Sequence, residues 1–353
     1  MHPEPTPIRT ALLAYGMSGE VFHAPILHVH PGFELRSILR RSRPEPLARY
    51  PAVQVTDDAE AIFSDPDIEL IVVNTPEYTH HELARRALLA GKHVVVEKAF
   101  TVTENEAQDL IALAEAQGRM LTVYQSRRWD GDFMTIRQLL ASGVLGRVVR
   151  YEARYDRWRP EPAPGWKEEG RPGTGILYNL GSHLIDQAIA LFGYPESVMA
   201  DVRIQRSGGR SPDCFDLWMQ YPAVQVRLSA NYLTRLQAPR FRILGDQGAF
   251  VKYGTDPQEA ALKAGRYPGE PGWGLEPEPD WGELATGPEH APARKVPTLP
   301  GNYAGFYDGV YASVRMGAPP PVPVLDSLMK VRVIEAAMRS AAEGAAASTK
   351  APA

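Results

Sequence analysis

Cysteine is nearly absent from this 353-residue chain, in which only Cys214 occurs. A single cysteine excludes an intramolecular disulfide and any metal site built from several cysteines, and we assign no metal ligands. No apolar run approaches the roughly 18 residues needed to cross a membrane, and the N-terminal MHPEPTPIRT lacks the order of a signal peptide. The sequence therefore predicts a cytoplasmic protein without a membrane partner.

An excess of either charge is also lacking. The chain has 38 Lys and Arg against 42 Asp and Glu, a net charge of −4, and both signs are dispersed. Because no basic face is evident, we expect no nucleic-acid partner. A chain of this length exceeds the usual single hydrophobic core, so the sequence predicts two domains.

Short apolar runs alternate with amphipathic segments through the first third of the chain, and this alternation predicts a parallel, doubly wound α/β sheet. Three consecutive valines after His93 are typical of a strand buried on both faces. Strands are expected at Ile8–Ala14, Phe33–Leu39, Val53–Val55, Glu69–Val73, His93–Val96 and Met120–Tyr124, with helices near 18–30, 57–64, 78–90 and 103–117.

The first strand-to-helix turn resembles the glycine pattern G-x-G-x-x-G, with Ala14 in the first position and Gly16 and Gly19 in the others. Gly16 stands where the backbone must approach a pyrophosphate, and Gly19 where the helix packs closely on its strand. Met17 and Ser18 lie between them, where a helix N-terminus offers N–H groups to phosphates. This setting favours dinucleotide binding over a plain structural turn.

The second strand ends in arginines, where an NAD site usually has a carboxylate for the ribose hydroxyl. Arg40, Arg41 and Arg43 occupy this stretch, and arginine pairs with a 2′-phosphate through charge-assisted hydrogen bonds. The pattern therefore predicts NADP in preference to NAD. The alternative is that these arginines belong to a solvated turn.

Further polar side chains follow the later strands, at the edge where open α/β sheets bind ligands. Lys98 directly follows the buried strand at His93, so a rigid strand would hold it beside a ligand; the alternative is a solvated loop lysine. A helix opens shortly afterwards at the capping box Thr103-x-x-Glu106. The other cofactor-site candidates are Asn74, Thr75, Pro76, Glu97, Gln125 and His80, of which His80 could instead simply sit in its helix.

The pattern changes after about residue 125, where longer alternating segments favour an antiparallel sheet. Residues 264–301 are dense in Pro and Gly and are expected to form a long loop or arm. We predict a dinucleotide-binding domain at 1–125, a second domain at 126–343 and a disordered tail at 344–353. Strands are expected at Val148–Trp158, Val198–Gln205, Phe215–Gln220, Val224–Tyr232, Phe241–Leu244 and Ala249–Lys252, and helices at 303–316 and 326–343, the last of them packing onto the first domain.

A glycine-rich stretch at 170–175 precedes a helical segment in which Asn179, His183 and Asp186 share one face. Such glycines make room for a ligand. Polar residues opposite an apolar helix face are often only its solvated side, so the spacing alone leaves a catalytic role for His183 open.

Four motifs together resemble the Gfo/Idh/MocA oxidoreductases. They are A-Y-G-M-S-G at 14–19, N-T-P-x-x-x-H at 74–80, E-K at 97–98, and G-x-x-x-N-L-G-x-H at 175–183. Within that family the chain is most similar to NADP-dependent scyllo-inositol 2-dehydrogenases and related sugar oxidoreductases, through V-F-H-A-P at 21–25, Y-Q-S-R-R-W-D at 124–130, Y-D-R-W-R-P at 155–160 and K-Y-G-T-D-P-Q-E-A at 252–260.

The resemblance implies an N-terminal Rossmann domain and a C-terminal α/β domain whose large open, mainly antiparallel sheet serves a homodimer or homotetramer. It also implies that Lys98 is the catalytic lysine and His183 the catalytic histidine. Asn179 stands where the family usually has aspartate, and Ala99 where E-K-P has proline. An amide can orient a substrate but cannot stabilise an imidazolium by charge, so the Asn179 replacement is the more serious departure.

The expected activity is hydride transfer between NADP and a secondary alcohol or ketone, with Lys98 handling the proton. Planar donors and aromatic rings suit a polyhydroxylated ring, so an inositol or an aldose is favoured over a hydroxy acid. Two alternatives stay open: a reductase of another keto-sugar or an imine, and a non-catalytic NADP-binding regulatory protein. The residues assigned to the substrate are Arg127, Tyr155, Arg157, Trp166, Asn179 and His183.

Overall fold

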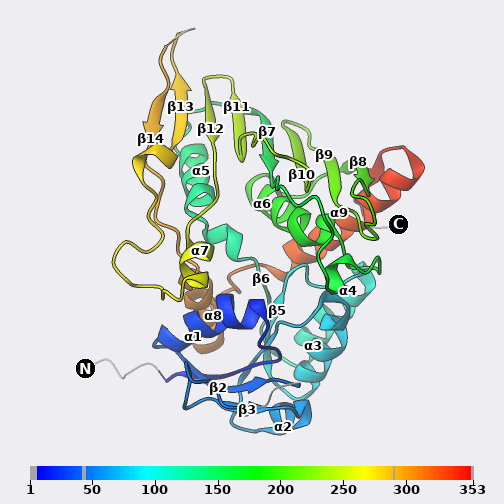
Figure 1. Ribbon diagram of the computed structural model, residues 1–353, viewed down its shortest axis with the longest axis vertical. Coiled ribbons are helices and arrows are strands. Elements are labelled where there is room, and N and C mark those ends of the chain that lie inside the picture. The colour runs from blue at the N-terminus through cyan, green and yellow to red at the C-terminus, as the bar shows by residue number, and fades with distance from the viewer. Residues whose placement is uncertain (1–5, 42–44, 289–290, 351–353) are drawn as a thin grey trace.

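The computed structural model describes residues 6–41, 45–288 and 291–350, and its first half forms a six-stranded sheet (Figure 1). All neighbouring strands are parallel, in the order β3-β2-β1-β4-β5-β6. This confirms the predicted doubly wound sheet. The strands are β1 (Ile8–Leu12), β2 (Phe33–Leu39), β3 (Gln54–Thr56), β4 (Leu70–Val73), β5 (His93–Glu97) and β6 (Leu121–Tyr124).

Helices cover both faces of this sheet, which explains why its central strands are apolar throughout. One apolar core joins the sheet to α1 (Ala24–Val29) and to α8 (Ala304–Met316), a helix from the far end of the chain. The opposite core contains α2 (Ala59–Ser64), α3 (His80–Leu89) and α4 (Glu104–Ala116). The predicted capping box at Thr103 and Glu106 is present at the start of α4.

The second sheet has nine strands and is mixed but mostly antiparallel, because only β10 and β7 pair in parallel. Its core contains α5 (Gly131–Ala141), α6 (Ser182–Phe192) and α9 (Val324–Glu343). The strand order is β14-β13-β12-β11-β7-β10-β9-β8-β15. The strands are β7 (Val148–Arg154), β8 (Ser197–Arg203), β9 (Cys214–Gln220), β10 (Gln225–Asn231), β11 (Phe241–Gly245), β12 (Gly248–Lys252), β13 (Gly282–Thr286), β14 (Arg294–Val296) and β15 (Ala347–Ser348).

Short helical segments connect these elements. The two π-helical turns are η1 (Ser18–His23) and η5 (Leu177–Gly181), each of which runs directly into an α-helix. The remaining segments are α7 (Gln258–Lys263) and the 3-10 turns η2 (Glu77–Thr79), η3 (Ser126–Trp129), η4 (Trp166–Glu168) and η6 (Glu278–Asp280). Within the described residues, no helix is long and apolar enough to cross a membrane.

The long loop or arm predicted at 264–301 is correct only in part, because this stretch also contributes β13 and β14 to the edge of the second sheet (Figure 1). Leu284 of β13 is buried against that sheet. At Gly282 a side chain would collide with the ring of Phe250, so glycine is required within this strand. The abundance of Pro and Gly concealed a strand in which one of the glycines serves close packing.

The prediction of a disordered tail at 344–353 is wrong for the residues that the structure describes, and 351–353 lie outside them. β15 pairs antiparallel with β8, joining Ala347 to Val198. The backbone N–H of Thr349 donates to the carbonyl of Glu196 at 3.2 Å. The edge of β8 supplies unpaired backbone groups, which the small residues of the tail gave no reason to expect.

Helix α9 contacts elements of both halves, including α4, α6, β6 and β8. Near the start of α9, Asp326 forms an ion pair with Arg128 at 2.9 Å, and Arg128 also pairs with Asp186 of α6 at 2.8 Å. Lys330 of α9 is completely buried, and its Nζ has no hydrogen-bond partner among the described residues. Burial lowers the pKa of Lys330 to about 7.

Replacing Lys330 with methionine should therefore stabilise the protein. In the unfolded chain the Lys330 amine is mostly protonated up to pH 10.5. In the folded protein it is mostly neutral above about pH 7. The buried charge of Lys330 therefore lowers the free energy of unfolding by its full amount at and below pH 7. This destabilisation decreases as the pH rises and is absent near pH 10.5. We expect Lys330→Met to gain at least about 1 kcal/mol in free energy of unfolding near pH 7.

Urea unfolding at pH 7 and pH 10 tests this expectation, with the exposed Lys263→Met variant as a control that should show no gain. A Lys330→Met variant that is no more stable than wild type at pH 7, or equally stabilised at both pH values, would contradict it.

Candidate active site

The carboxyl ends of β1, β4, β5 and β6 lie next to one another in the parallel sheet, and each is followed by residues assigned to the cofactor site. Gly16 follows β1, Asn74 follows β4, Lys98 follows β5, and Gln125 follows β6. The fold thus brings together four segments that are far apart in the sequence. This edge is where open α/β sheets bind their ligands.

The turn after β1 has the geometry of a phosphate-binding loop. A side-chain carbon added at Gly16 would meet nothing within 4 Å, whereas one at Gly19 would lie 2.4 Å from the carbonyl oxygen of Ala14. The side chain of Asn74 closes the turn, accepting from Ala14 N–H at 2.9 Å and donating to Ala14 C=O at 2.8 Å. Ala14 itself does not have a positive φ, so alanine replaces the first glycine of the pattern without strain.

Glu97 connects this turn to the end of β5. Its carboxylate accepts a hydrogen bond from the Ser18 hydroxyl at 2.5 Å, lies 3.0 Å from His23 Nε2, and accepts from the backbone N–H of Lys98 at 3.0 Å. Burial alone would raise the pKa of Glu97, but the hydrogen bonds and charges of His23, Lys98 and Ser18 lower it to about 2. The group is therefore an ionised anchor. Its partner His23 is a residue that the sequence analysis did not assign to the site.

His80 does not offer its ring to a ligand. Its Nδ1 lies 2.9 Å from the carbonyl oxygen of Phe100, and its Nε2 lies 2.8 Å from that of Thr75. The buried ring thus joins the loop after β4 to the loop after β5, where the Lys98–Ala99 bond is cis. Both ring nitrogens of His80 therefore face backbone carbonyls, which favours a structural role over contact with a cofactor.

Gln125 and Arg127, both assigned from the loop after β6, differ in their surroundings. The carboxamide of Gln125 is completely buried, and neither of its polar atoms has a partner among the described residues. The guanidinium of Arg127, in contrast, is held by Glu259, by Asp130 at 3.4 Å and by the Tyr303 hydroxyl at 2.7 Å. Three hydrogen bonds of Arg127 are thus made within the protein, and its assignment to the substrate stays a prediction.

The arginines after β2 lie at the same edge. The guanidinium of Arg40 lies 5.7 Å from the centre of the Tyr15 ring and donates to the carbonyl of Glu45 at 3.1 Å. Arg41 is exposed, and Arg43 lies outside the described residues. Arg40 and Arg41 thus follow the strand that neighbours the glycine turn, as a 2′-phosphate site requires.

Lys98 meets Asn179 at the start of the second half. Its Nζ donates to the backbone carbonyl and to the side-chain Oδ1 of Asn179, both at 3.1 Å. Lys167 donates to the same Oδ1 at 3.1 Å, and the amide of Asn179 donates to the Tyr232 hydroxyl at 3.2 Å. Burial and the charge of Lys98 lower the pKa of Lys167 to about 8.

Neither Lys167 nor Tyr232 is among the site residues predicted from the sequence. Lys167 directly follows Trp166, which was assigned, but an isolated lysine in a polar loop carried no signal of its own. Tyr232 is the last residue of the strand predicted at Val224–Tyr232, and only the folding of the second sheet beside η5 brings its hydroxyl to Asn179.

His183 lies one turn beyond Asn179, in α6. The ring is buried, and Nδ1 has no hydrogen-bond partner among the described residues. Burial, reinforced by the charges of Lys98 and Arg127, lowers the pKa of His183 well below its usual value. The imidazole is thus neutral at physiological pH, and it can exchange hydrogen bonds but not supply a charge. The carboxylate of Asp186, the third residue of the predicted face, accepts two hydrogen bonds from the guanidinium of Arg128.

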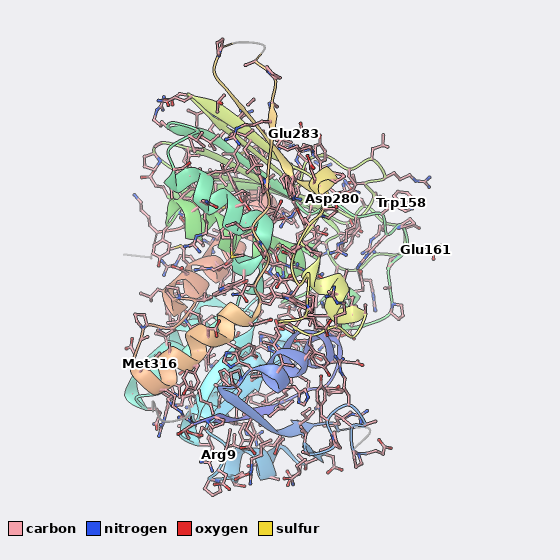
Figure 2. All side chains as sticks on the ribbon, turned by 90° about the vertical axis from the view of Figure 1, so that its left-hand side faces the viewer. Arg9, Trp158, Glu161, Asp280, Glu283 and Met316 are labelled. Carbon is pink, nitrogen blue, oxygen red and sulfur yellow. The ribbon has the colours of Figure 1, made fainter. Side chains whose placement is uncertain are left out.

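The remaining substrate candidates lie in the loop between β7 and η5, whose outer part is marked by Trp158 and Glu161 in Figure 2. The guanidinium of Arg157 lies 5.1 Å from the centre of the Tyr155 ring. Trp166 meets the ring of Tyr78 edge-on, with centres 6.3 Å apart. The loop runs beside Tyr232, because Arg159 N–H donates to the Tyr232 carbonyl at 2.7 Å.

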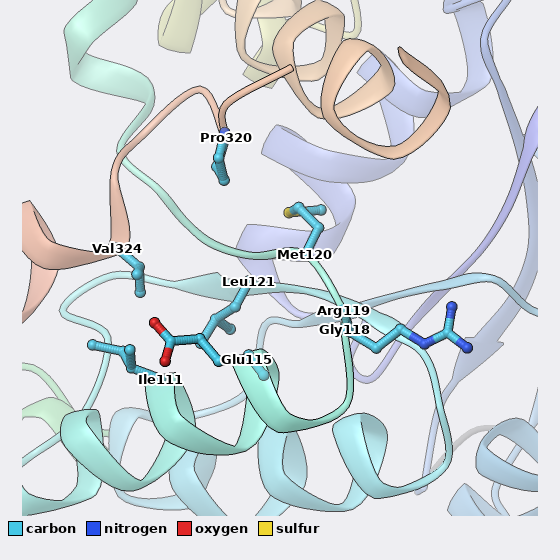
Figure 3. A pocket seen from close by; sticks show the side chains of 9 residues that line it. Ile111, Glu115, Gly118, Arg119, Met120, Leu121, Pro320 and Val324 are labelled. Carbon is cyan, nitrogen blue, oxygen red and sulfur yellow. The ribbon is translucent and has the colours of Figure 1, made fainter. Parts of the chain in front are cut away.

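Figure 3 shows a further pocket, of about 220 Å³. It is lined by Ile111, Glu115, Arg119, Pro320 and Val324, together with residues at the beginning of β6. Lys98 and Gln125 follow the opposite, carboxyl ends of β5 and β6. The pocket therefore lies at the other edge of the parallel sheet and does not contribute to the candidate site.

A glycine turn on a parallel sheet, with a lysine at the same edge, is typical of dinucleotide-dependent oxidoreductases. Comparison with protein families agrees. Residues 8–125 match the oxidoreductase family model for the NAD-binding Rossmann fold, and residues 137–349 match its C-terminal alpha/beta domain. The chain belongs to the Gfo/Idh/MocA family of oxidoreductases, and the expected family is confirmed.

The chain resembles several known members over nearly its whole length. It is 41% identical to the uncharacterized oxidoreductase YdgJ of Escherichia coli, with 95% of this chain and 96% of YdgJ covered. It is 39% identical to the NADP-dependent scyllo-inositol 2-dehydrogenase IolW of Bacillus subtilis, covering 95% and 94%. The solved structure of the oxidoreductase yvaA of Bacillus subtilis superimposes with a TM-score of 0.92 at 38% identity, covering 97% and 98%.

Proposed function

We propose that the protein is an NADP-preferring dehydrogenase or reductase that acts on a secondary alcohol or ketone of a cyclitol or sugar. One observation carries the proposal: Lys98 Nζ is held by two oxygens of Asn179 at the sheet edge that also bears the glycine turn. The resemblance to a scyllo-inositol 2-dehydrogenase supports a polyhydroxylated ring as substrate.

The residues present fit a nicotinamide dinucleotide. The space beside Gly16 leaves room for a pyrophosphate, and Gly19 allows the close contact with Ala14. Arg40 and Arg41 supply charge at the end of β2 for a 2′-phosphate. The buried carboxamide of Gln125 has donors and an acceptor without partners among the described residues, which suits a planar amide ligand. When bound, the cofactor would accept or deliver the hydride.

The protein would supply orientation and proton transfer. Lys98 would take up the substrate hydroxyl proton during oxidation and return it during reduction. Asn179 fixes the position of its amine through the two 3.1 Å hydrogen bonds. His183, neutral and with a ring nitrogen free of partners among the described residues, would share a hydrogen bond with the substrate oxygen.

Replacing Lys98 with alanine should remove the proton-transfer group but leave the cofactor loop intact. We expect kcat to fall by at least about 100-fold while the Kd for NADPH stays within about threefold of wild type. Steady-state turnover of cyclitols and sugars, with fluorescence titration of NADPH, measures both quantities. The exposed Lys263→Ala variant serves as the control. Tight NADPH binding without turnover of any cyclitol, sugar, keto-sugar or imine by wild type would favour the non-catalytic alternative.

The cofactor preference is tested by the double variant Arg40→Ala, Arg41→Ala. Lost charge-assisted contacts should weaken NADPH binding by at least about tenfold more than NADH binding. Arg36→Ala is a matched control, because Arg36 lies earlier on β2 and pairs with Asp67. Equal losses for the two cofactors in the double variant would refute a 2′-phosphate site.

We also propose that the open face of the second sheet joins copies of this chain into a homodimer or homotetramer. Met199 of β8 and Trp218 of β9 are cross-strand partners and are 50% and 43% exposed, respectively. Large apolar side chains side by side on an uncovered sheet face are typical of contact surfaces.

A charge placed on this face should break the assembly. We expect Trp218→Glu to lower the molar mass measured by light scattering. Met316→Glu should leave it unchanged, because the exposed Met316 ends α8, which packs on the first sheet (Figure 2). A monomeric wild type, or a Trp218→Glu variant with the mass of wild type, would disprove this surface as the interface.

A further inference from the structure

Two lysines contact Asn179, and a third cationic side chain, Arg159, lies beside the ring of Tyr232, one contact away. Lys98 and Lys167 both donate to its Oδ1 at 3.1 Å. The guanidinium of Arg159 lies 5.7 Å from the centre of the ring of Tyr232, whose hydroxyl accepts from the Asn179 amide, and its charge acts on Lys167. Within the described residues none of the three cations forms an ion pair.

An arginine in the same region is neutralised by carboxylates. Arg206, which also lies over the Tyr232 ring at 4.8 Å, pairs with Glu168 at 2.8 Å and with Asp213 at 3.0 Å. Arg206 shows that this region can supply carboxylates to a cation. Lys98, Lys167 and Arg159 have no such partner within the described residues.

Two acidic residues lie near these cations but do not neutralise them by contact. The carboxylate of Glu97 is occupied by His23 and Ser18. Glu77 is buried, and burial raises its pKa despite the charges of Lys98 and Lys167. Within the described residues, Glu77 makes no ion pair with either lysine. The two ammonium groups thus share a neutral amide oxygen as acceptor.

This arrangement is electrostatically incomplete. Two like charges that share one acceptor repel each other, and a negative charge between them would stabilise both. An aspartate at position 179 would supply that charge from the protein. Asparagine keeps the hydrogen bonds but leaves the charge to be supplied by a ligand.

We propose that the substrate is a polyhydroxylated ring that carries an anionic group, a carboxylate or a phosphate, which Lys167 and Arg159 bind beside Asn179. This inference rests on the proposed function, since it specifies the substrate of the same site. Lys98 handles the hydroxyl proton, whereas Lys167 and Arg159 determine specificity. The ring hydroxyls would still use the polar and aromatic groups of the 155–166 loop.

The test is calorimetric binding to the full-length protein saturated with NADPH. The probes are matched sets in the gluco, galacto and manno configurations: the neutral aldose, its uronate and its 6-phosphate. We expect a uronate or a 6-phosphate to bind at least about tenfold more tightly than the matching neutral sugar. The tighter of the two identifies the anionic group. Its Kd should rise with salt concentration, and that of the neutral sugar should not.

Variants separate specificity from folding. Lys167→Gln should remove most of the preference for the anionic sugar, Lys167→Arg should retain it, and the distant Lys295→Gln should behave as wild type. Asn179→Asp should reverse the preference, because the protein then supplies the negative charge itself. The proposal is overturned if the neutral and anionic sugars bind equally, or if neither binds. It is also overturned if the preference for the anionic sugar persists in Lys167→Gln.

Turnover of the same sugars with NADP or NADPH separates this inference from the proposed function. Turnover of the sugars without a preference for the anionic ones overturns the inference of an anionic substrate but leaves the proposed activity standing. Preferential binding of the anionic partner without turnover of any sugar supports the anion site and overturns the proposed activity.

Discussion

The ionised carboxylate of Glu97 is the contact on which the geometry of the candidate site depends. It stands at the end of β5, whose last four residues are buried, and accepts hydrogen bonds from the Ser18 hydroxyl of the glycine turn and from the backbone N–H of Lys98. Through His23 it also reaches α8, because Nδ1 of that ring lies 2.6 Å from the Tyr307 hydroxyl. One side chain therefore fixes the glycine turn, the lysine and a helix from the C-terminal part of the chain relative to one another.

The second half of the chain completes the site from the other side. Asn179, in the middle of η5, accepts a hydrogen bond from Lys98. The ion pairs of Arg128 with Asp186 and Asp326 hold α6, the loop after β6 and α9 together. Buried ion pairs of this kind add little net stability but penalise any arrangement that separates the charges. They favour one relative position of Lys98 and Asn179, which proton transfer and substrate orientation both require.

The electrostatics of the site depend on one neutral residue. Asn179 keeps the hydrogen bonds to Lys98, Lys167 and Tyr232 but contributes no charge. A family member with aspartate at this position would meet its lysines with an internal anion. The proposed specificity for an anionic ring follows from this difference, because the same cations attract either an internal or an external negative charge.

The sequence by itself determined the parallel sheet, the glycine turn, the family and the positions of Lys98, Asn179 and His183, because each of these is encoded by local periodicity or by residues at short spacing. It did not reveal β13 to β15, since edge strands of Gly-, Pro- or Ala-rich sequence form only where a neighbouring strand offers free backbone groups. Tertiary structure alone decided which polar groups are free and which are used internally. Arg127 hydrogen-bonds with Tyr303, and the ring of His80 lies against the carbonyl of Phe100. Lys167 reaches Asn179 only because folding places η4 beside η5. Contacts between segments far apart in the chain leave no periodic trace in the sequence, and these contacts set the charge balance of the site.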